Sequence, residues 1–268
     1  KSMNTYFRLE AGTPDDDNRD YLPERIKGSD IVVNENGNNS HPYPEKLTEC
    51  HGQLLEDGSV SEVPGEGISG TWYEYIPDSY DPSRAVPLVM SMHGGLMTGW
   101  GQCIYTSWSI LSEREGFICV FPDGHYNRFW QVQVFDSLSE PPKGLNGMEF
   151  PKPAPTIEEN VDCSFTLRLI RHIQKKYRID EGRIFMQGMS NGCAMTMQFA
   201  RRYGYLLAGA AGSASPICIR NLIDKNRQLI NQGGPVAVWD SHPENNRHGE
   251  ENMQAEARRI RECRYYWL

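Results

Sequence analysis

One junction in the sequence constrains the fold more than any other feature. An apolar run at 184–186 leads directly into Gly188-Met189-Ser190-Asn191-Gly192, and the helix-forming segment 193–200 follows at once. The two glycines permit a sharp turn from strand to helix, because glycine allows backbone conformations and close approaches that a side chain would prevent. The sequence therefore predicts a strand, a tight turn and a helix in succession, with the hydroxyl of Ser190 exposed at the turn.

The rest of the central sequence repeats this alternation of strand and helix. Two nearly continuous apolar runs, at 86–92 and 117–121, are typical of strands that are buried on both faces of a parallel sheet. The segment 157–177 has apolar residues at near-helical spacing and basic residues on the other side. The remaining expected elements are strands at 71–76, 183–187, 207–212 and 236–239, and helices at 106–115, 191–202, 219–232 and 250–264. This order predicts an α/β fold with a mostly parallel central sheet flanked by helices.

The character of the sequence changes near residue 68. Before this point the chain is polar and rich in Asp, Asn, Gly, Pro and Glu, with short β-like runs such as 30–33. After it, the alternating pattern begins. We therefore expect an irregular or β-rich N-terminal extension over residues 1–68 and a single α/β domain over residues 69–268.

Composition excludes several classes of protein. The formal net charge is -8 and the basic residues are spread along the chain, so we expect no nucleic-acid partner, which would need a concentrated basic face. No apolar run approaches the roughly 20 residues that a membrane span requires. The 7 cysteines form no Cys-x-x-Cys pair and have no metal-ligand spacing with histidine, so neither a metal site nor another cofactor is expected.

A second glycine motif, Met92-His93-Gly94-Gly95-Leu96, directly follows one of the buried runs. Glycines at a strand end can present backbone N–H groups without a side chain in the way. The N–H of Gly95 or Leu96, together with the N–H of Asn191 after the serine, is predicted to form an oxyanion hole. His93 is expected to stabilise the turn and not to act as a base.

With these motifs in order, the sequence resembles the carboxylesterases of the α/β-hydrolase fold that are related to polyhydroxybutyrate depolymerases and to feruloyl and acetylxylan esterases. The resemblance extends over residues 70–245. It rests on Pro87-Leu88-Val89, His93-Gly94-Gly95, Glu115-Gly116-Phe117, Phe121-Pro122-Asp123-Gly124 with Trp130, Asn160-Val161-Asp162, Tyr177-Arg178-Ile179-Asp180 before Arg183-Ile184, and the segment around Ser190. The sequence departs from the family at Cys193, where a further glycine is common, and in a long insert at 131–155.

The resemblance implies a serine esterase that works through an acyl-enzyme. Ser190 would be its nucleophile, and Glu244 or Asp240, which follow the strand at 236–239, would be the triad acid. Trp130 lies close behind a strand end, where it would either wall a substrate pocket or pack in the core.

The general base is the least determined part of the predicted triad. In the resembling family the histidine lies on a loop beyond the last long helix, whereas this sequence ends at Leu268, immediately after the helix expected at 250–264. Two expectations follow. Either the catalytic domain lacks its C-terminal end, with the histidine, or His242 or His248 near the acid has taken that role.

The resemblance also implies a substrate class and a compartment. We expect feruloyl, acetyl or short hydroxyalkanoyl esters, either as small molecules or linked to plant polysaccharide, and a secreted or periplasmic protein. Two alternatives stay open from the sequence: a peptidase of the same fold, and a non-catalytic α/β-hydrolase scaffold that acts as a binding module.

Overall fold

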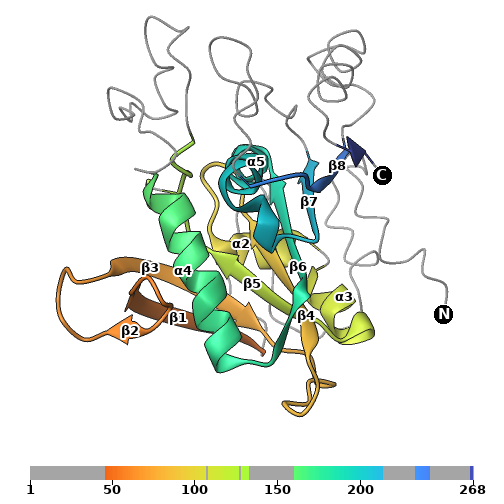
Figure 1. Cartoon of the computed structure of the whole chain (residues 1–268), viewed down its shortest axis with the longest axis horizontal. Helices are drawn as coiled ribbons and strands as arrows, with labels where there is room; N and C mark the ends of the chain where they lie inside the picture. The colour runs from red at the N-terminus through yellow and green to blue at the C-terminus, as the bar shows by residue number, and fades with distance from the viewer. Residues whose placement is uncertain are drawn as a thin grey trace, which may run out of the picture.

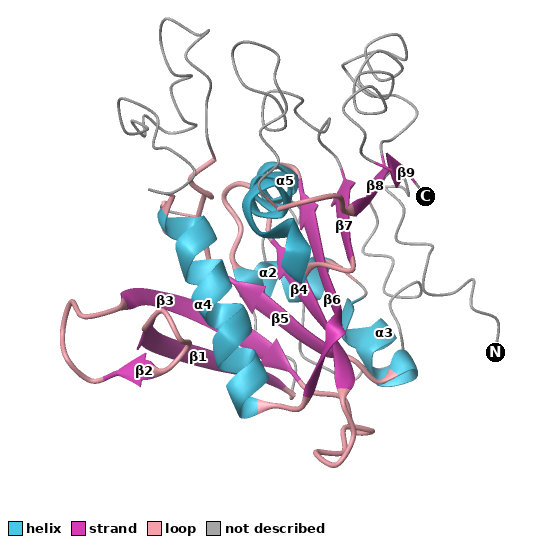
Figure 2. Cartoon of the chain, in the orientation of Figure 1, coloured by secondary structure: helices cyan, strands magenta, loops and turns pink. Residues whose placement is uncertain are grey.

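The computed structural model of the chain describes residues 46–106, 108–126, 128–132, 160–213, 233–241 and 266–267. These residues form a twisted 9-stranded sheet with helices on both faces (Figures 1 and 2). The strand order is β2-β1-β3-β5-β4-β6-β7-β8-β9. The elements are β1 (Leu47–Leu54), β2 (Val60–Ser61), β3 (Ile68–Tyr75), β4 (Val86–Met92), α2 (Gly99–Tyr105), α3 (Trp108–Glu115), β5 (Ile118–Pro122), α4 (Val161–Lys176), β6 (Ile179–Met189), α5 (Asn191–Tyr203), the 3-10 helix η4 (Gly204–Leu206), β7 (Gly209–Ser213), β8 (Ala237–Ser241) and β9 (Tyr266–Trp267).

The sheet has a parallel part and an antiparallel edge. β5, β4, β6, β7, β8 and β9 run parallel to their neighbours in that order, as the alternation of strands and helices predicts. β3 pairs antiparallel with β5, and β1 pairs antiparallel with both β3 and β2. Since parallel neighbours must be joined by a crossover, the helices between them are carried to the two faces of the sheet.

The antiparallel edge corrects the expected boundary near residue 68. β1 pairs with β3 along its whole length of 8 residues, from Leu47 opposite Tyr75 to Leu54 opposite Ile68. The side chain of Leu54 is fully buried in the same core as the central strands. The described part of the predicted extension is therefore an integral edge of the sheet, while residues 1–45 lie outside the described residues.

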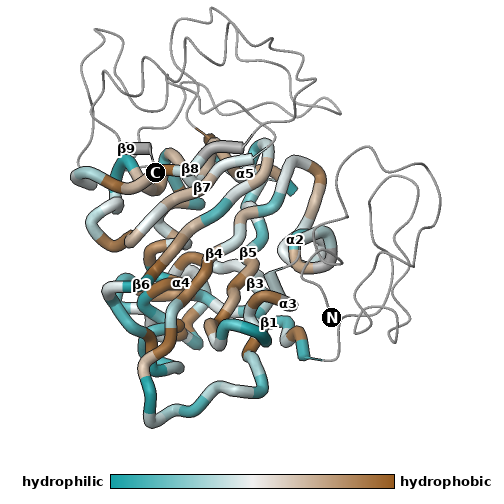
Figure 3. Tube along the Cα trace, turned by 90° about the vertical axis from the view of Figure 1, so that its right-hand side faces the viewer, coloured by the Kyte–Doolittle hydropathy of each residue, from teal (hydrophilic) through white to brown (hydrophobic). Residues whose placement is uncertain are grey.

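Each face of the sheet has its own hydrophobic core. α4 and α5 cover one face, where Leu88, Met90 and Met92 of β4 point, and α2 and α3 cover the other, where Val89 points. This alternation follows from the two-residue period of a strand. Figure 3 shows hydrophobic residues concentrated in the central strands β4 and β5. Both faces of these strands are covered, which explains their nearly continuous apolar sequences.

Helix boundaries follow the capping residues. The helix expected from residue 157 begins later, because Asn160 caps α4 and its Oδ1 accepts a hydrogen bond from Cys163 N at 2.9 Å. A further helix, α2, precedes the expected helix at 106–115 and begins after Thr98, which accepts from Gly101 N at 3.1 Å. The helices expected at 219–232 and 250–264, and nearly all of the insert, lie outside the described residues. None of the described helices combines the length and the hydropathy needed to cross a membrane.

The pairing of β1 with the sheet predicts unequal effects of two truncations in the N-terminal region. Leu54→Ala should lower the free energy of unfolding by about 2–5 kcal/mol, because it leaves a cavity in the main core. Val63→Ala should change it by less than about 0.5 kcal/mol, because 58% of the Val63 surface is exposed. Urea unfolding of both variants checks this. Equal, small changes would contradict the assignment of β1 to the cooperative core.

Candidate active site

The two glycine motifs meet at the carboxyl ends of neighbouring strands. β4 and β6 pair in parallel with Met92 opposite Gly188, so the turns that follow them begin at the same level of the sheet. From β4 the chain moves to β5 on one side, and it then returns to β6 on the other side. Ligands of open α/β sheets bind outside the carboxyl ends of the strands at such a reversal of strand order.

Ser190 occupies a strained turn between β6 and α5. Its backbone has φ 53° and ψ -115°, a conformation that residues with a side chain rarely adopt. Its N–H donates to the carbonyl of Ser213 at 2.8 Å, and its carbonyl accepts from Cys193 N at 3.0 Å, where α5 begins. Ser190 is exposed. The predicted strand, tight turn and helix with an exposed serine is confirmed.

The glycines on either side of Ser190 make this turn possible. A Cβ atom on Gly188 would lie 1.9 Å from the carbonyl oxygen of Gly192, and a Cβ on Gly192 would lie 2.3 Å from the carbonyl oxygen of Met92. The first turn of α5 therefore rests directly on the backbone ends of β6 and β4. A side chain at either glycine would push the serine away from the second motif.

The turn after β4 packs between the serine turn and the segment 128–130. A Cβ on Gly94 would lie 3.1 Å from Met189 Cε, and a Cβ on Gly95 would lie 2.4 Å from the Phe129 ring. The two glycines thus allow the backbone to fit between two side chains.

The backbone N–H groups of the two motifs differ in their partners. The N–H of Leu96 donates to the carbonyl of Arg128 at 2.9 Å, so it is already engaged. Within the described residues, the N–H groups of Gly95 and Asn191 have no acceptor. Of the two donors predicted after β4, Gly95 is therefore the one that is available.

Backbone strain is concentrated at this site. In the described part of the chain, the non-glycine residues with positive φ are Leu96, Arg128 and Ser190.

His93 is a structural residue, as expected. It is fully buried, and both of its ring nitrogens are used: Nδ1 donates to the carbonyl of Gly94 at 2.7 Å, and Nε2 accepts from Gly124 N at 2.9 Å. This arrangement fits the neutral imidazole. Burial lowers the pKa of His93 to about 4, against the opposing effect of the hydrogen bond to Gly94. His93 therefore fastens the turn and has no free nitrogen for a proton from the serine.

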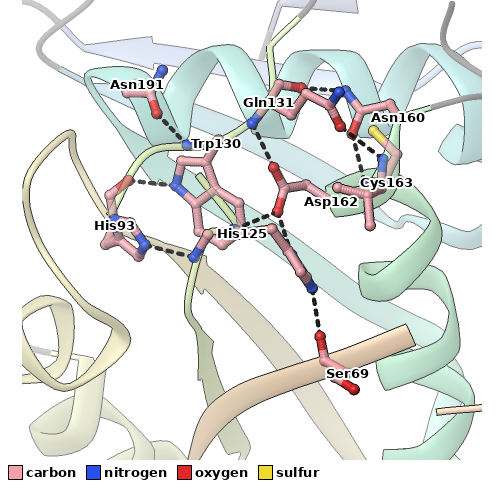
Figure 4. A network of polar contacts seen from close by, with 11 residues as sticks. Ser69, His93, His125, Trp130, Gln131, Asn160, Asp162, Cys163 and Asn191 are labelled. Carbon is pink, nitrogen blue, oxygen red and sulfur yellow. Dashed lines mark hydrogen bonds and ion pairs between the residues drawn. The ribbon is translucent and has the colours of Figure 1, made fainter. Parts of the chain in front are cut away.

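Trp130 packs in the core, which is one of the two alternatives that the sequence leaves open. Its side chain has no exposed surface. The indole Nε1 donates to the carbonyl of His93 at 2.7 Å, and the ring centroids of Trp130 and His93 lie 4.6 Å apart. The main-chain N–H of Trp130 donates to Asn191 Oδ1 at 2.7 Å (Figure 4).

The buried Asp162 and the partly buried His125 form a pair that the sequence analysis did not single out as a site. The carboxylate of Asp162 is fully buried and accepts from both the main-chain N–H and the Nδ1 of His125, at 3.0 Å and 2.6 Å, and from Gln131 N. The Nε2 of His125 donates to the carbonyl of Ser69 at 2.8 Å (Figure 4). The two residues are 37 positions apart, so no local pattern relates them. The only signal in the sequence was Asn160-Val161-Asp162, as a segment of family resemblance.

The negative charge of Asp162 explains the raised pKa of His125. Burial lowers its pKa, but the hydrogen bond and the negative charge of Asp162 raise it by more, so that the net shift is upward. Both ring nitrogens face acceptors, which fits the imidazolium. Asp162 thereby holds the segment between β5 and the start of the long insert at both residue 125 and residue 131.

The candidates for the acid and the base belong to β8 and to the sequence that follows it. Met189 is opposite Ser213, and Ser213 is opposite Ser241, so the end of β8 lies two strands from the end of β6, roughly 10 Å away at the usual strand spacing. Asp240 is described for its backbone alone. Glu244, His242 and His248 lie outside the described residues.

The histidines that are described all have other roles. His51 lies on β1 and contacts Glu49 and Thr71, and His172 lies on α4 and contacts the carbonyl of Gly58. His93 and His125 have the partners given above. Within the described part of the chain, no imidazole is hydrogen-bonded to Ser190.

Comparison with known proteins finds relatives in sequence and in fold. No model of a known protein family matches the sequence. The chain is 26% identical over 162 residues to the probable acetylxylan esterase A of Aspergillus fumigatus, and 26% identical over 151 residues to the feruloyl esterase B of Thermothelomyces thermophilus. These alignments cover 58% and 54% of this chain, and 38% and 45% of the relatives. The matched part of this chain thus spans less than half the length of these relatives.

Solved structures show the fold. A ferulic acid esterase from Anaeromyces mucronatus superposes with a TM-score of 0.53 at 13% identity, covering 85% of this chain and 83% of that one. The fluorophosphonate-binding serine hydrolase F of Staphylococcus aureus gives a TM-score of 0.53 at 12% identity, over 83% and 89% of the two chains. The chain has the α/β-hydrolase fold. In sequence it is similar to the acetylxylan and feruloyl esterases.

The buried His93 and the partly buried His125 predict opposite dependences of stability on pH. The pKa of His93 is about 4 in the folded state and 6.5 in an unfolded chain. Between these two pH values the unfolded chain binds a proton that the folded state does not, so the free energy of unfolding should fall as the pH is lowered from 6.5 to 4. The raised pKa of His125 stabilises the folded state at low pH, and this contribution should be lost as the pH rises above 6.5 through that pKa.

Urea unfolding of the wild type and of His125→Gln between pH 4 and pH 9 checks both effects. In the variant, the free energy of unfolding should fall less on the alkaline side than in the wild type, and it should fall as in the wild type on the acid side. An alkaline decline of the same size in both proteins would contradict a raised pKa for His125.

Proposed function

We propose that this chain forms the catalytic part of a serine carboxylesterase that hydrolyses acetyl or feruloyl esters of plant polysaccharide. One observation carries the proposal. The exposed Ser190 sits in a strained turn, beside the N–H groups of Asn191 and Gly95, which have no acceptor in the described residues. A serine held in this way beside two free donors suits attack on a carbonyl carbon.

The reaction proceeds in two acyl transfers. Ser190 Oγ attacks the ester carbonyl carbon while a histidine accepts the hydroxyl proton, and the carbonyl oxygen becomes an oxyanion between the N–H groups of Asn191 and Gly95. The intermediate collapses, the imidazolium gives its proton to the leaving alcohol, and an acyl-enzyme remains. Water, deprotonated by the same histidine, then attacks the acyl carbon and releases the acid. A single donor of this kind contributes about 10²–10³ in kcat.

The base and the acid of the proposed triad come from the carboxyl-terminal part of β8 or from the sequence that follows it. The register of β6, β7 and β8 supports this location, because the carboxyl end of β8 at Ser241 lies at the same edge of the sheet as the end of β6 before Ser190. Within this chain, His242 and His248 are the candidates for the base, and Glu244 and Asp240 are the candidates for the acid. An acid after the strand two places from the serine orients the imidazole and stabilises its positive charge.

The substrate class rests on the relatives. The proteins of similar sequence are named acetylxylan esterases and a feruloyl esterase, and one superposable structure is a ferulic acid esterase. Both activities cleave an ester by acyl transfer and differ in the acyl group. The proposal therefore commits to ester hydrolysis at Ser190 and to these two acyl groups.

Replacement of the nucleophile is the primary test. Ser190→Ala should lose labelling by a fluorophosphonate probe and lower kcat for p-nitrophenyl acetate or methyl ferulate by roughly 10⁴-fold or more. Ser69→Ala removes a different exposed hydroxyl and should retain both properties. Failure of the wild-type chain to react with the probe and with both esters would contradict the proposal and favour a binding module. Cleavage of an amide but of no ester would favour a peptidase.

The proposed triad predicts that variants of the acid and of the base lose kcat while KM changes little. Of Asp240→Asn and Glu244→Gln, one should lower kcat by about 10³–10⁴-fold with little change in KM, because the acid acts on the imidazole and not on the bound ester. His242→Asn and His248→Asn test the base in the same way. Steady-state kinetics of the four variants measure this. Full activity in both histidine variants would contradict a base at either position.

A further inference from the structure

We propose that Trp130 is a positioning residue that fixes the two oxyanion-hole donors relative to each other. The inference rests on the proposed function and deepens it. The two donors, Asn191 N–H and Gly95 N–H, lie on turns that are far apart in the sequence, and Trp130 is bonded to both of these turns.

The first bond of Trp130 is to the serine turn. Its main-chain N–H donates to Asn191 Oδ1 at 2.7 Å. Asn191 is the first residue of α5, and its own N–H points out of the helix end. The side chain of Asn191 is therefore anchored by Trp130, while its backbone N–H stays available for an oxyanion.

The second bond is to the turn after β4. The indole Nε1 of Trp130 donates to the carbonyl of His93 at 2.7 Å, and its ring lies on the His93 imidazole with centroids 4.6 Å apart. His93 is held in turn by its bonds to Gly94 and Gly124. Gly95, the second donor, follows two residues after His93. Figure 4 shows Trp130 between Asn191 and His93.

The neighbours of Trp130 strengthen the same connection. The carbonyl of Arg128 accepts from Leu96 N at 2.9 Å, and the Phe129 ring would lie 2.4 Å from a Cβ on Gly95. Three consecutive residues thus contact the turn that carries the Gly95 donor. Contacts from both sides confine that turn, which fixes where its N–H points.

The segment that contains Trp130 is itself anchored to α4. Asp162 accepts hydrogen bonds from His125 N and from Gln131 N, on either side of residues 128–130. Asp162 has no exposed surface, and a buried carboxylate holds its donors firmly, because any unpaired oxygen would be costly. The backbone on either side of Trp130 is therefore held in place.

This arrangement matters because donors stabilise an oxyanion only at the correct position. Catalytic groups must be held within about 0.5 Å of the productive geometry. Loss of the indole N–H leaves the His93 carbonyl without its partner and lets the turn move. The loss should raise the energy of the transition state more than that of the bound ester, because the carbonyl oxygen gains its negative charge only as the tetrahedral intermediate forms.

Trp130→Phe tests the inference, because it keeps an aromatic ring and removes the indole N–H. Trp72→Phe is a matched control: Trp72 is also buried, and its Nε1 donates to Glu74 at 2.8 Å on β3. Both variants should lose similar stability in urea unfolding. Trp130→Phe should lower kcat about 10–100-fold with KM changed less than about 3-fold, while Trp72→Phe should keep both.

A tetrahedral inhibitor gives a second readout. A phenylboronic acid forms a negatively charged tetrahedral adduct with Ser190 that places a hydroxyl oxygen at the oxyanion position, and its affinity should fall in Trp130→Phe by about the same factor as kcat/KM. Asn191→Ala removes the acceptor of the Trp130 N–H and should show the same split between kcat and KM, which keeps the test available if Trp130→Phe does not fold.

The outcomes separate this inference from the proposed function. If the wild type hydrolyses the ester, and kcat and boronate affinity are unchanged in Trp130→Phe, or in Asn191→Ala where Trp130→Phe does not fold, the inference is overturned alone. An equal rise in KM and fall in boronate affinity with kcat unchanged would also overturn it, since it would indicate a role in substrate binding. A wild type that neither hydrolyses esters nor binds the boronate would overturn the proposed function and this inference with it.

Discussion

The close approach of three backbone segments at Gly188, Gly192 and Met92 is the constraint on which the site depends. The first turn of α5 lies against the ends of β6 and β4 without an intervening side chain. This contact forces Ser190 into a conformation with positive φ and exposes it at the edge of the sheet. Strain of this kind is of order 1–3 kcal/mol and persists only where the surroundings hold it. Here the surroundings are the parallel strands themselves, which cannot separate without loss of the core.

A second layer of polar groups holds the turn opposite the serine. Two histidines, one buried and one partly buried, take part in different charge states, and their partners explain the difference. His93 faces a carbonyl and an N–H, so a neutral ring satisfies both and burial lowers its pKa. His125 faces a carboxylate and a carbonyl, so the imidazolium satisfies both and Asp162 raises its pKa. Complete pairing in a low dielectric makes such networks rigid.

The sequence predicted the parts of the fold that depend on local patterns. The apolar run of β4 gave its bounds, and the two glycines around Ser190 predicted the turn, because both signals lie within a few residues. The pairing of β1 with β3 was not predicted, since an antiparallel edge depends on a register between distant segments. The bonds of Trp130 to His93 and Asn191 were missed for the same reason. Its burial follows from the three-dimensional arrangement of two turns, and the sequence left packing and substrate contact as equal alternatives.

The central claim is that Ser190, Asn191 N–H and Gly95 N–H converge on one reacting carbonyl. A crystal structure of the protein after reaction with a fluorophosphonate tests it most directly, because the phosphonyl oxygen stands in for the oxyanion. The account predicts a covalent bond from Ser190 Oγ to phosphorus, with the phosphonyl oxygen about 2.7–3.1 Å from both nitrogens. An adduct on another residue, or a phosphonyl oxygen on Ser190 directed away from these two N–H groups, would contradict it.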